Sequence, residues 1–338
     1  MNAFRALRCH VISDDIATLK LDEVTLPPPQ AGEVRVKLKA TAVNFPDILM
    51  VQGKYQLKPD LPFAPGNEGA GIIDELGEGV RGFKIGDAVI ASFRYGGYAE
   101  AINVQAGRLA PLPKNMDFVH GAAYRAAYNT AYVALYRRAQ LQKGETLLVH
   151  GAASGVGLAA VEVGKILGAI VIATARGETK LHFAKSRGAD HVIEVTGGFR
   201  NKVKELTGGR GADVIYDPVG GDVFDESVRC IAWGGRLTII GFTSGRIPTI
   251  GVNMPLIKGF SIVGVRAGEY GRQDPIKGAE NLATLDGWAA DGIIKPYVCA
   301  IFPLEKAVDG MRLLQERRAL GKVVITMSED AGKADATA

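Results

Sequence analysis

The segment from Glu145 to Gly177 constrains the fold more than any other part of this 338-residue chain. It reads ETLLVHGAASGVGLAAVEVGKILGAIVIATARG, which predicts a strand, a turn of small residues, a helix and a second strand within about 30 residues. Such a unit can hold a pyrophosphate against backbone N–H groups at a helix N-terminus, where the helix dipole favours negative charge. The segment therefore predicts a parallel-sheet domain that binds a dinucleotide.

The turn departs from the usual G-x-G-x-x-G pattern. The three glycine positions of that pattern are Ala152, Ser154 and Gly157, so only the last is glycine. The strand before the turn, the amphipathic helix after it and the second strand support the dinucleotide interpretation. The alternative is a tight strand-to-helix turn in another kind of α/β protein.

The end of the second strand predicts which dinucleotide is bound. An acid at this place would bind the ribose 2′-hydroxyl of NADH, but the sequence has Arg176, with Lys180 one helical turn later. Guanidinium and ammonium groups both bind phosphate well, so the pair predicts NADPH through its 2′-phosphate. The alternative is a pair of ordinary surface cations at the start of a helix.

The remaining chain predicts an α/β protein with two domains. Residues 1–110 contain short alternating segments such as Glu33–Leu38, separated by turn signals, which predict a β barrel or sandwich. A helix is predicted at 120–138, after which strands and helices alternate, as in a doubly wound parallel sheet. The expected strands are 146–150, 170–174, 191–195, 214–217, 236–240, 261–265 and 322–327, and the expected helices are 158–167, 180–186, 201–206, 275–290 and 304–317. Residues 328–338 are predicted to be a disordered tail.

Composition excludes several classes of protein. Three cysteines that lie far apart cannot form a disulfide framework, which indicates a reducing, cytoplasmic setting. A net charge of +4 without a basic run gives no support for nucleic-acid binding, and no apolar stretch is long enough for a membrane span. The 43 glycines, about twice the usual share, gather at the predicted turns and strand ends.

Several segments together resemble the medium-chain dehydrogenase/reductase superfamily. They are Ala40–Tyr55 with the run that follows at 62–71, Gly86–Val89 with 96–100, the turn 151–157, and finally 217–221, 241–245 and 321–324. Within the superfamily the chain is most similar to the zinc-free NADPH:quinone oxidoreductase branch, which includes zeta-crystallin. The resemblance implies a GroES-like barrel domain, residues 1–124 and 267–338, and a Rossmann domain, residues 125–266, with the active cleft between them. It also implies a homodimer or homotetramer, joined through the strand at 260–265.

The positions of zinc ligands distinguish the branches of this superfamily. Zinc-containing members of the superfamily carry a cysteine near the position that resembles Asn44 of this chain. Their Gly-His-Glu segment is similar to Gly66-Asn67-Glu68 here, in which an amide stands in place of the imidazole. Residues 92–97 run straight to the next strand, where those relatives insert a cysteine-rich lobe. Zinc requires thiolate or imidazole ligands at fixed spacing, so no catalytic and no structural zinc is predicted.

The resemblance also implies roles for individual residues. Thr130 would contact the nicotinamide end of the cofactor, Asn44 would hold the nicotinamide or a substrate oxygen, and Lys322 would close over the cofactor. The other cofactor contacts implied are Ser154, Gly155 and Val156 at the pyrophosphate, Val219 and Gly220 at the ribose, and Gly241, Phe242, Thr243, Ser244, Val265 and Arg266 near the nicotinamide.

Candidate catalytic residues are polar groups in the matching segments: Asn44, Asp47, Tyr55 and Tyr128. Asp47 and Tyr55 could orient water or donate a proton, and Tyr128 could line the acceptor pocket. The alternatives are that Tyr55 only packs against neighbouring residues and that Asp47 only caps a helix.

Without zinc no Lewis acid would polarise a substrate oxygen, so the expected reaction is hydride transfer from NADPH to an acceptor that is already electrophilic. The resemblance favours a quinone. The alternatives are reduction of the C=C bond of an α,β-unsaturated carbonyl compound (an enone, a 2-haloacrylate or an enoyl thioester) and a non-catalytic protein that only binds NADPH.

Overall fold

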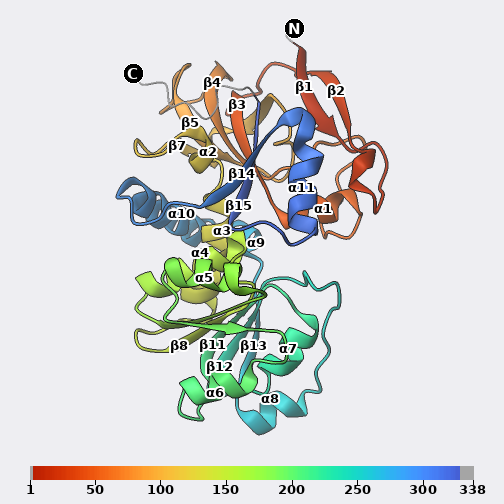
Figure 1. The fold of residues 1–338 in the computed structure, drawn as a ribbon. Helices are drawn as coiled ribbons and strands as arrows, with labels where there is room; N and C mark the ends of the chain where they lie inside the picture. Colours follow the sequence, from red (N-terminus) through yellow and green to blue (C-terminus); the bar gives the residue numbers. More distant parts are fainter. Residues whose placement is uncertain (1–2, 328–338) are drawn as a thin grey trace. The chain divides into compact units, whose positions relative to one another are not determined.

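The computed structural model describes residues 3–327, and the predicted tail at 328–338 lies outside the described residues (Figure 1). The chain divides into two compact units. One consists of Met1–Ala126 together with Trp288–Ala338, and we call it the split unit; the other is Ala127–Gly287, the inserted unit. No helix within residues 3–327 has the length and apolar character needed to cross a bilayer.

The split unit is built on one long strand. β3 (Glu33–Val43) pairs antiparallel with strands from both parts of the chain, and Val323 lies opposite Val43 in that register. The alternating pattern predicted at 33–38 is therefore the first half of a longer strand. The strand order of the seven-stranded sheet is β14-β15-β3-β4-β5-β7, with β6 also paired to β3, and β1 and β2 form a separate pair. The strands are β1 (Ala3–Arg8), β2 (Lys20–Thr25), β4 (Glu68–Leu76), β5 (Ala88–Ser92), β6 (Ala101–Gln105), β7 (Leu109–Pro111), β14 (Val298–Pro303) and β15 (Lys322–Thr326).

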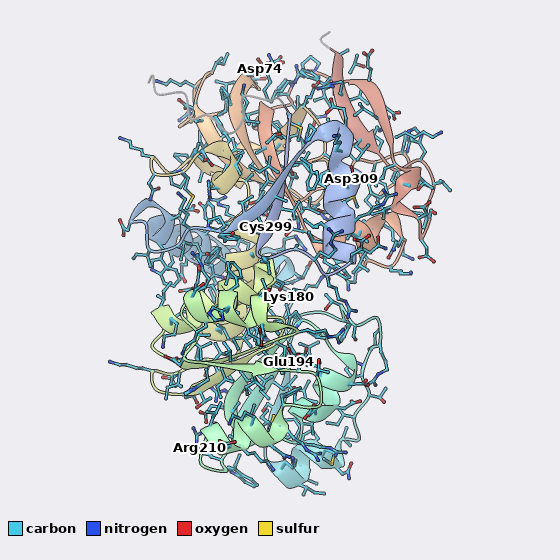
Figure 2. The ribbon with its side chains drawn as sticks, in the orientation of Figure 1. Asp74, Lys180, Glu194, Arg210, Cys299 and Asp309 are labelled. Carbon is cyan, nitrogen blue, oxygen red and sulfur yellow. The ribbon has the colours of Figure 1, made fainter. Side chains whose placement is uncertain are left out.

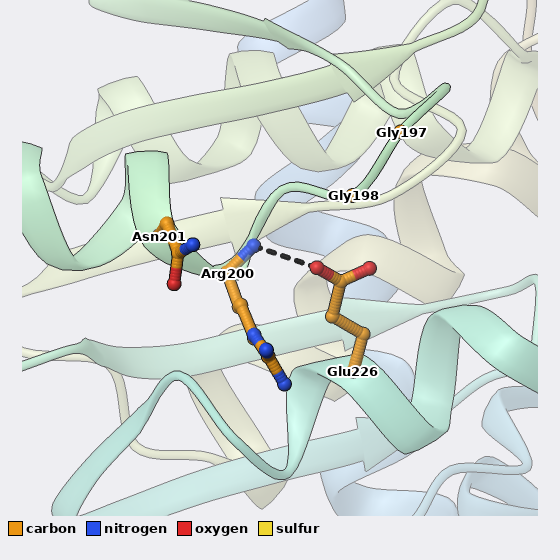
Figure 3. Close-up of a pocket in the computed structure, with 5 residues that line it drawn as sticks. All are labelled: Gly197, Gly198, Arg200, Asn201 and Glu226. Carbon is orange, nitrogen blue, oxygen red and sulfur yellow. Dashed lines mark hydrogen bonds between the residues drawn. The ribbon is translucent and has the colours of Figure 1, made fainter.

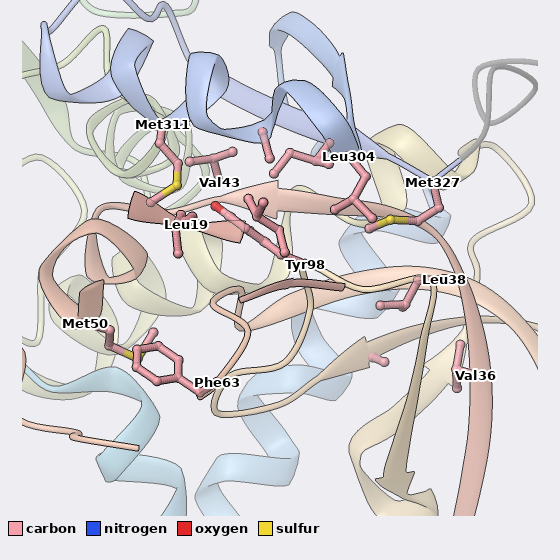
Figure 4. Close-up of a cluster of buried hydrophobic side chains, with 14 of the residues drawn as sticks. Leu19, Val36, Leu38, Val43, Met50, Phe63, Tyr98, Leu304, Met311 and Met327 are labelled. Carbon is pink, nitrogen blue, oxygen red and sulfur yellow. The ribbon is translucent and has the colours of Figure 1, made fainter. Parts of the chain in front are cut away.

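The core of the split unit draws on distant parts of the sequence. Figure 4 shows Val36, Val43 and Tyr98 from the first part of the chain together with Leu304 and Met311 from the last part. All five are at most 1% exposed. The two segments share one core as well as one sheet. The split unit can therefore fold only when both segments of the chain are present.

The inserted unit contains a six-stranded parallel sheet. Its strand order is β10-β9-β8-β11-β12-β13, in which two βαβ halves meet between β8 and β11. In sheets of this kind a ligand binds outside the carboxyl ends of the strands, at the point where the order reverses. The strands are β8 (Thr146–Val149), β9 (Ile170–Ala175), β10 (His191–Glu194), β11 (Ala212–Asp217), β12 (Ile231–Ile239) and β13 (Ser261–Gly264).

Most predicted helices are present, and the α/β class is confirmed. Three short helices that follow strands of the inserted unit were not predicted, because they lack a clear 3.6-residue apolar period; they are α7 (Gly221–Ser227), α8 (Asn253–Lys258) and α9 (Ala267–Gln273). The other α-helices are α1 (Phe45–Val51), α2 (Phe118–Gly121), α3 (Arg125–Tyr132), α4 (Gly155–Ile166), α5 (Glu178–Ser186), α6 (Arg200–Leu206), α10 (Pro275–Ala290) and α11 (Ala307–Gln315).

The helix predicted at 120–138 is broken into pieces. α2 ends at Gly121, α3 begins at Arg125, and a π-helical stretch at Val133–Arg138 follows. The N–H of Ala126 donates to the carboxylate of Glu68 at 2.8 Å. A side chain from β4 therefore satisfies an amide near the start of α3, which lets the chain begin a new helix where the sequence indicated a continuous one.

Residues 267–287 belong to the inserted unit, whereas the sequence placed them in the barrel domain. The guanidinium of Arg137 donates to the side chain of Asn281 at 2.8 Å and forms an ion pair with Glu280. Asn281 is only 1% exposed. These contacts attach the first part of α10 to the helical segment at 125–138, which local sequence patterns could not reveal.

Candidate functional site

The turn after β8 requires glycine at two positions. Gly151 has a φ of +58°, in the left-handed region that favours glycine. A Cβ added to Gly157 would lie 2.2 Å from the carbonyl oxygen of Gly151, so only glycine fits there. Ser154 is the N-cap of α4, and its hydroxyl oxygen accepts a 3.2 Å hydrogen bond from the N–H of Gly157. The turn thus leaves a side-chain-poor cradle at a helix N-terminus, which fits a pyrophosphate.

The end of β9 carries the two predicted cations. Arg176 is exposed. Lys180, labelled in Figure 2, is partly exposed on α5. The structure also brings Glu194 to this place from the neighbouring strand β10, and its carboxylate accepts a 2.6 Å bond from the N–H of Gly177. Hydrogen bonds from backbone N–H groups of Thr196 and Gly177 lower the pKa of Glu194, which keeps it ionised. The sequence reasoning missed this acid because it lies on another strand.

The loops after β11 and β12 are joined by hydrogen bonds. The N–H of Thr243 donates to Pro218 at 3.1 Å, and the N–H of Ser244 donates to Val219 at 2.9 Å. The structure therefore gathers Val219, Gly220, Gly241, Phe242, Thr243 and Ser244 at the carboxyl ends of two adjacent strands.

Asp217 organises the first of these loops. It is 1% exposed, and one carboxylate oxygen accepts bonds from the N–H groups of Val219 (2.8 Å) and Gly220 (2.9 Å). Its other oxygen is buried without a hydrogen-bond partner. Burial raises the pKa of Asp217, against the effect of these two bonds.

The remaining cofactor residues of the inserted unit lie close to strand or helix ends. Val265 follows β13, and its N–H donates to Ile239 at 3.0 Å, which continues the pairing with β12. Arg266 is the next residue, and its guanidinium nitrogen Nη1 lies 3.7 Å from Glu269 Oε2. Thr130 is partly exposed on α3.

A buried polar cluster occupies the split unit where β15, β4 and the start of α1 meet. The ammonium of Lys322 lies 2.6 Å from Asn44 Oδ1 and 3.0 Å from Glu68 Oε1. The side-chain nitrogen of Asn44 donates to Glu68 Oε1 at 3.0 Å and to Asn67 Oδ1 at 2.9 Å. Lys322, Glu68 and Asn44 are 5%, 2% and 8% exposed. We call these four residues, Asn44, Asn67, Glu68 and Lys322, the amide–lysine cluster.

Asp47 lies beside this cluster and joins it through the backbone of Asn44. Its carboxylate accepts bonds from the N–H of Asn44 (2.8 Å), the hydroxyl of Tyr98 (3.1 Å) and the N–H of Gly66 (3.2 Å). The first bond belongs to the capping box at the start of α1. Burial raises the pKa of Asp47 to about 7, although the bonds from Asn44 and Tyr98 oppose the shift.

The two predicted tyrosines lie in different units. Tyr55 is partly exposed in the split unit and packs against its apolar core. Tyr128 is 2% exposed in the inserted unit, and its hydroxyl donates to Glu162, which also accepts a 3.0 Å bond from Arg187. Burial and the charge of Glu162 raise the pKa of Tyr128 well above its ordinary value.

Glu68, Asn67 and Tyr98 were not among the predicted site residues. The sequence does carry a signal for the central pair: Lys322 and Glu68 are charges that directly precede runs without charge, at 323–327 and 69–73. A charge in such a position is buried only when it is paired.

Two further features lie outside these sites. In the part of the chain that the structure describes, residues 3–327, no group of three or more His, Cys, Asp or Glu side chains could hold a metal ion. A pocket of about 390 Å³ lies at the start of α6, where the N–H of Arg200 donates to Glu226 at 2.9 Å (Figure 3). It is lined by Gly197, Gly198, Arg200, Asn201 and Glu226, none of which is a predicted site residue.

Known families and proteins match both units. The model of the alcohol dehydrogenase GroES-like domain matches residues 30–114, and that of zinc-binding dehydrogenases matches residues 155–284. The chain is 37% identical over 337 residues to a quinone oxidoreductase-like protein 2 homolog of Nematostella vectensis, covering 97% of this chain and 90% of that protein.

Solved structures agree with this similarity. The quinone oxidoreductase of Escherichia coli complexed with NADPH is 30% identical, with a TM-score of 0.88, and the match covers 95% of this chain and 99% of that one. The CurK enoyl reductase is 26% identical, with a TM-score of 0.88 and coverage of 97% and 100%. The predicted GroES-like and Rossmann architecture is confirmed. The chain therefore belongs to the medium-chain dehydrogenase/reductase superfamily and, within it, to the quinone oxidoreductase branch.

Proposed function

We propose that this protein is an oxidoreductase that reduces quinones with NADPH. The observation that carries the proposal is the side-chain-poor cradle at Gly151–Gly157, at the reversal point of a parallel sheet, with Arg176 and Lys180 at the end of the next strand. The similarity of this chain to a quinone oxidoreductase complexed with NADPH supports the proposal of NADPH as cofactor and of a quinone as acceptor.

The residues of the inserted unit bind and orient the nucleotide. The N–H groups of Gly155 and Val156, with the hydroxyl proton of Ser154, bind the pyrophosphate, and Arg176 and Lys180 bind the 2′-phosphate. Thr130 and the residues gathered after β11, β12 and β13 hold the ribose and the nicotinamide. NADPH supplies the hydride when it is bound.

The split unit supplies polar groups for the acceptor. We keep Asn44, Asp47 and Tyr55 as candidates. Lys322, which was expected to close over the cofactor, is bound to Asn44 within the amide–lysine cluster. Tyr128 remains a candidate with its hydroxyl engaged by Glu162. The side chain of Asp47 also holds the start of α1, so its role includes positioning.

The test is oxidation of NADPH, followed at 340 nm, with a panel of benzoquinones, naphthoquinones, enones and enoyl thioesters. We expect turnover with quinones and a strong preference for NADPH over NADH. Tight binding of NADPH without turnover of any acceptor would instead identify a binding protein.

A second candidate is reduction of an activated C=C bond. The observation that favours it is the similarity to the CurK enoyl reductase over 97% of the chain. It predicts a higher kcat/KM for an enone or enoyl thioester than for any quinone in the same panel.

We also propose that the protein forms a homodimer through the edge strand β13. The backbone of an edge strand offers unpaired N–H and C=O groups to another copy. Apolar side chains gather beside it: Ile262 on β13 is 38% exposed, Leu256 on α8 is 81% exposed and Trp233 is 79% exposed. Trp233 lies against Gly259, between α8 and β13. A tetramer would need a further interface.

A cytoplasmic location is the last part of the proposal. All three cysteines, Cys9, Cys230 and Cys299, are free thiols, which fits a reducing compartment.

A further inference from the structure

The amide–lysine cluster contains two amides in series whose orientations are determined by charged groups. An ammonium can only donate hydrogen bonds and a carboxylate can only accept them. Asn44 Oδ1 must therefore face Lys322, and Asn44 Nδ2 must face Glu68. Rotating the Asn44 amide by 180° would place donors against the ammonium and an oxygen against the carboxylate.

This arrangement also determines the orientation of Asn67. Its Oδ1 accepts a 2.9 Å bond from Asn44 Nδ2, and a flipped Asn67 would set two donor groups against each other. The Nδ2 group of Asn67 is therefore directed away from Asn44. Asn67 is partly exposed, whereas Asn44, Glu68 and Lys322 are all buried.

Both N–H groups of Asn44 are used inside the cluster, by Glu68 and Asn67. The amide of Asn44 consequently has no hydrogen left to offer a substrate oxygen, which limits the role expected for it from the sequence. Among residues 3–327 the side chain of Asn67 bonds only through its oxygen, so its amide keeps both hydrogens.

We propose that Asn67 is the residue that donates a hydrogen bond to the carbonyl oxygen of the acceptor, and that Asn44, Glu68 and Lys322 are positioning residues that hold its amide in the donating orientation. The inference rests on the proposed function, because it names the group that meets a quinone oxygen. Negative charge grows on that oxygen as hydride adds to the quinone, and a donor already oriented towards it stabilises the charge without reorganisation. The proton that completes the hydroquinone comes from water.

The test compares Asn67→Ala with Asn67→Asp. Both lack the donor amide, but Asn67→Asp keeps an oxygen for Asn44 Nδ2 and can donate through its second oxygen once the carboxyl is protonated. At pH 7.5 we expect both variants to lose about 100-fold in kcat/KM for 1,4-naphthoquinone, with unchanged affinity for NADPH. As the pH is lowered from 8 to 5, the activity of Asn67→Asp relative to Asn67→Ala should rise several-fold.

A control with the same chemical change is Asn201→Asp, at an exposed position of the inserted unit, which should behave as the native protein. Thermal unfolding checks that each variant is folded. The inference is overturned if both Asn67 variants retain native kcat/KM, or if the ratio of the two is independent of pH.

A separate measurement distinguishes the inference from the proposed function. If the native protein reduces no quinone, the proposed function fails, and binding of 1,4-naphthoquinone, followed by protein fluorescence, still tests the donor. Asn67→Ala should then bind the quinone at least several-fold more weakly than the native protein, and equal binding would refute the role of Asn67.

Discussion

At the scale of single residues, the proposed preference for NADPH depends on the charge of Arg176. It is exposed at the end of β9, next to Gly177, whose N–H donates to the carboxylate of Glu194. An exposed guanidinium at this place can bind a phosphate through charged hydrogen bonds.

Arg176→Asp is expected to reverse the preference for NADPH. A hydrogen bond between charged groups contributes about 1.5–3 kcal/mol, so the KM for NADPH should rise by about 10- to 100-fold while that for NADH falls. Steady-state kinetics with both cofactors measures the ratio. Arg229→Asp makes the same change of charge at another exposed position of the inserted unit and should leave the ratio unaltered. Equal kinetics of Arg176→Asp and the native protein would exclude the phosphate role.

At the scale of structural elements, His150 joins three parts of the inserted unit. It follows β8, and its two ring nitrogens lie 2.8 Å from the hydroxyls of Thr174 on β9 and Ser227 on α7. It is 1% exposed, and burial lowers its pKa to about 3. The imidazole is therefore neutral in the folded protein at pH values where an unfolded chain would protonate it.

This difference predicts acid sensitivity. Between about pH 6.5 and pH 3 the unfolded state binds one more proton at His150 than the folded state, so stability falls as the pH falls, by up to about 1.4 kcal/mol per pH unit. The free energy of unfolding in urea, measured between pH 7 and pH 4, should fall with this slope. In His150→Asn the slope should be smaller by the amount that corresponds to about one proton. Asn201→Ala, at an exposed position without a titratable group, should keep the native slope. An unchanged slope in His150→Asn would contradict the prediction.

The ion pair of Lys322 and Glu68 likewise joins elements, namely β15 and β4. Lys322→Met leaves a buried carboxylate without its cation, which should lower the free energy of unfolding by about 3–5 kcal/mol. The double variant Lys322→Met/Glu68→Gln should lose clearly less than the sum of the two single variants. Lys54→Met removes an exposed ion pair with Asp14 in the same unit and should cost less than about 1 kcal/mol. Additive losses in the double variant would show that the buried pair is not coupled.

At the scale of the whole molecule, the proposed dimer is tested by its mass. The mass of the native protein measured by sedimentation should be twice 35.8 kDa. The double variant Leu256→Glu/Ile262→Glu should have the mass of a monomer and should still bind NADPH. Charged side chains beside β13 would place like charges opposite each other in a symmetric interface. Ile276→Glu changes another exposed apolar residue, 75% exposed on α10, and should remain dimeric. A native protein that sediments at 35.8 kDa would refute the interface.

Local patterns were sufficient to predict the fold class and the nucleotide turn. Strand and helix periods, and the small residues at 151–157, depend on neighbours within a few positions along the chain. The same reasoning failed at 120–138, because the break there depends on Glu68, and at 267–287, because the attachment of α10 depends on Arg137.

The sequence by itself determined that this chain has a parallel-sheet nucleotide unit and cations suited to a 2′-phosphate, and its resemblance to the superfamily predicted amides, Asn44 and Asn67, at the positions of zinc ligands. Only the tertiary structure decided what those side chains do. Lys322 and Glu68 are separated by 254 positions and Asn44 and Lys322 by 278, and no local pattern encodes such contacts. Their hydrogen bonds direct the amide nitrogen of Asn44 towards Glu68 and that of Asn67 away from Asn44, because the donors and acceptors of a buried network must match in space.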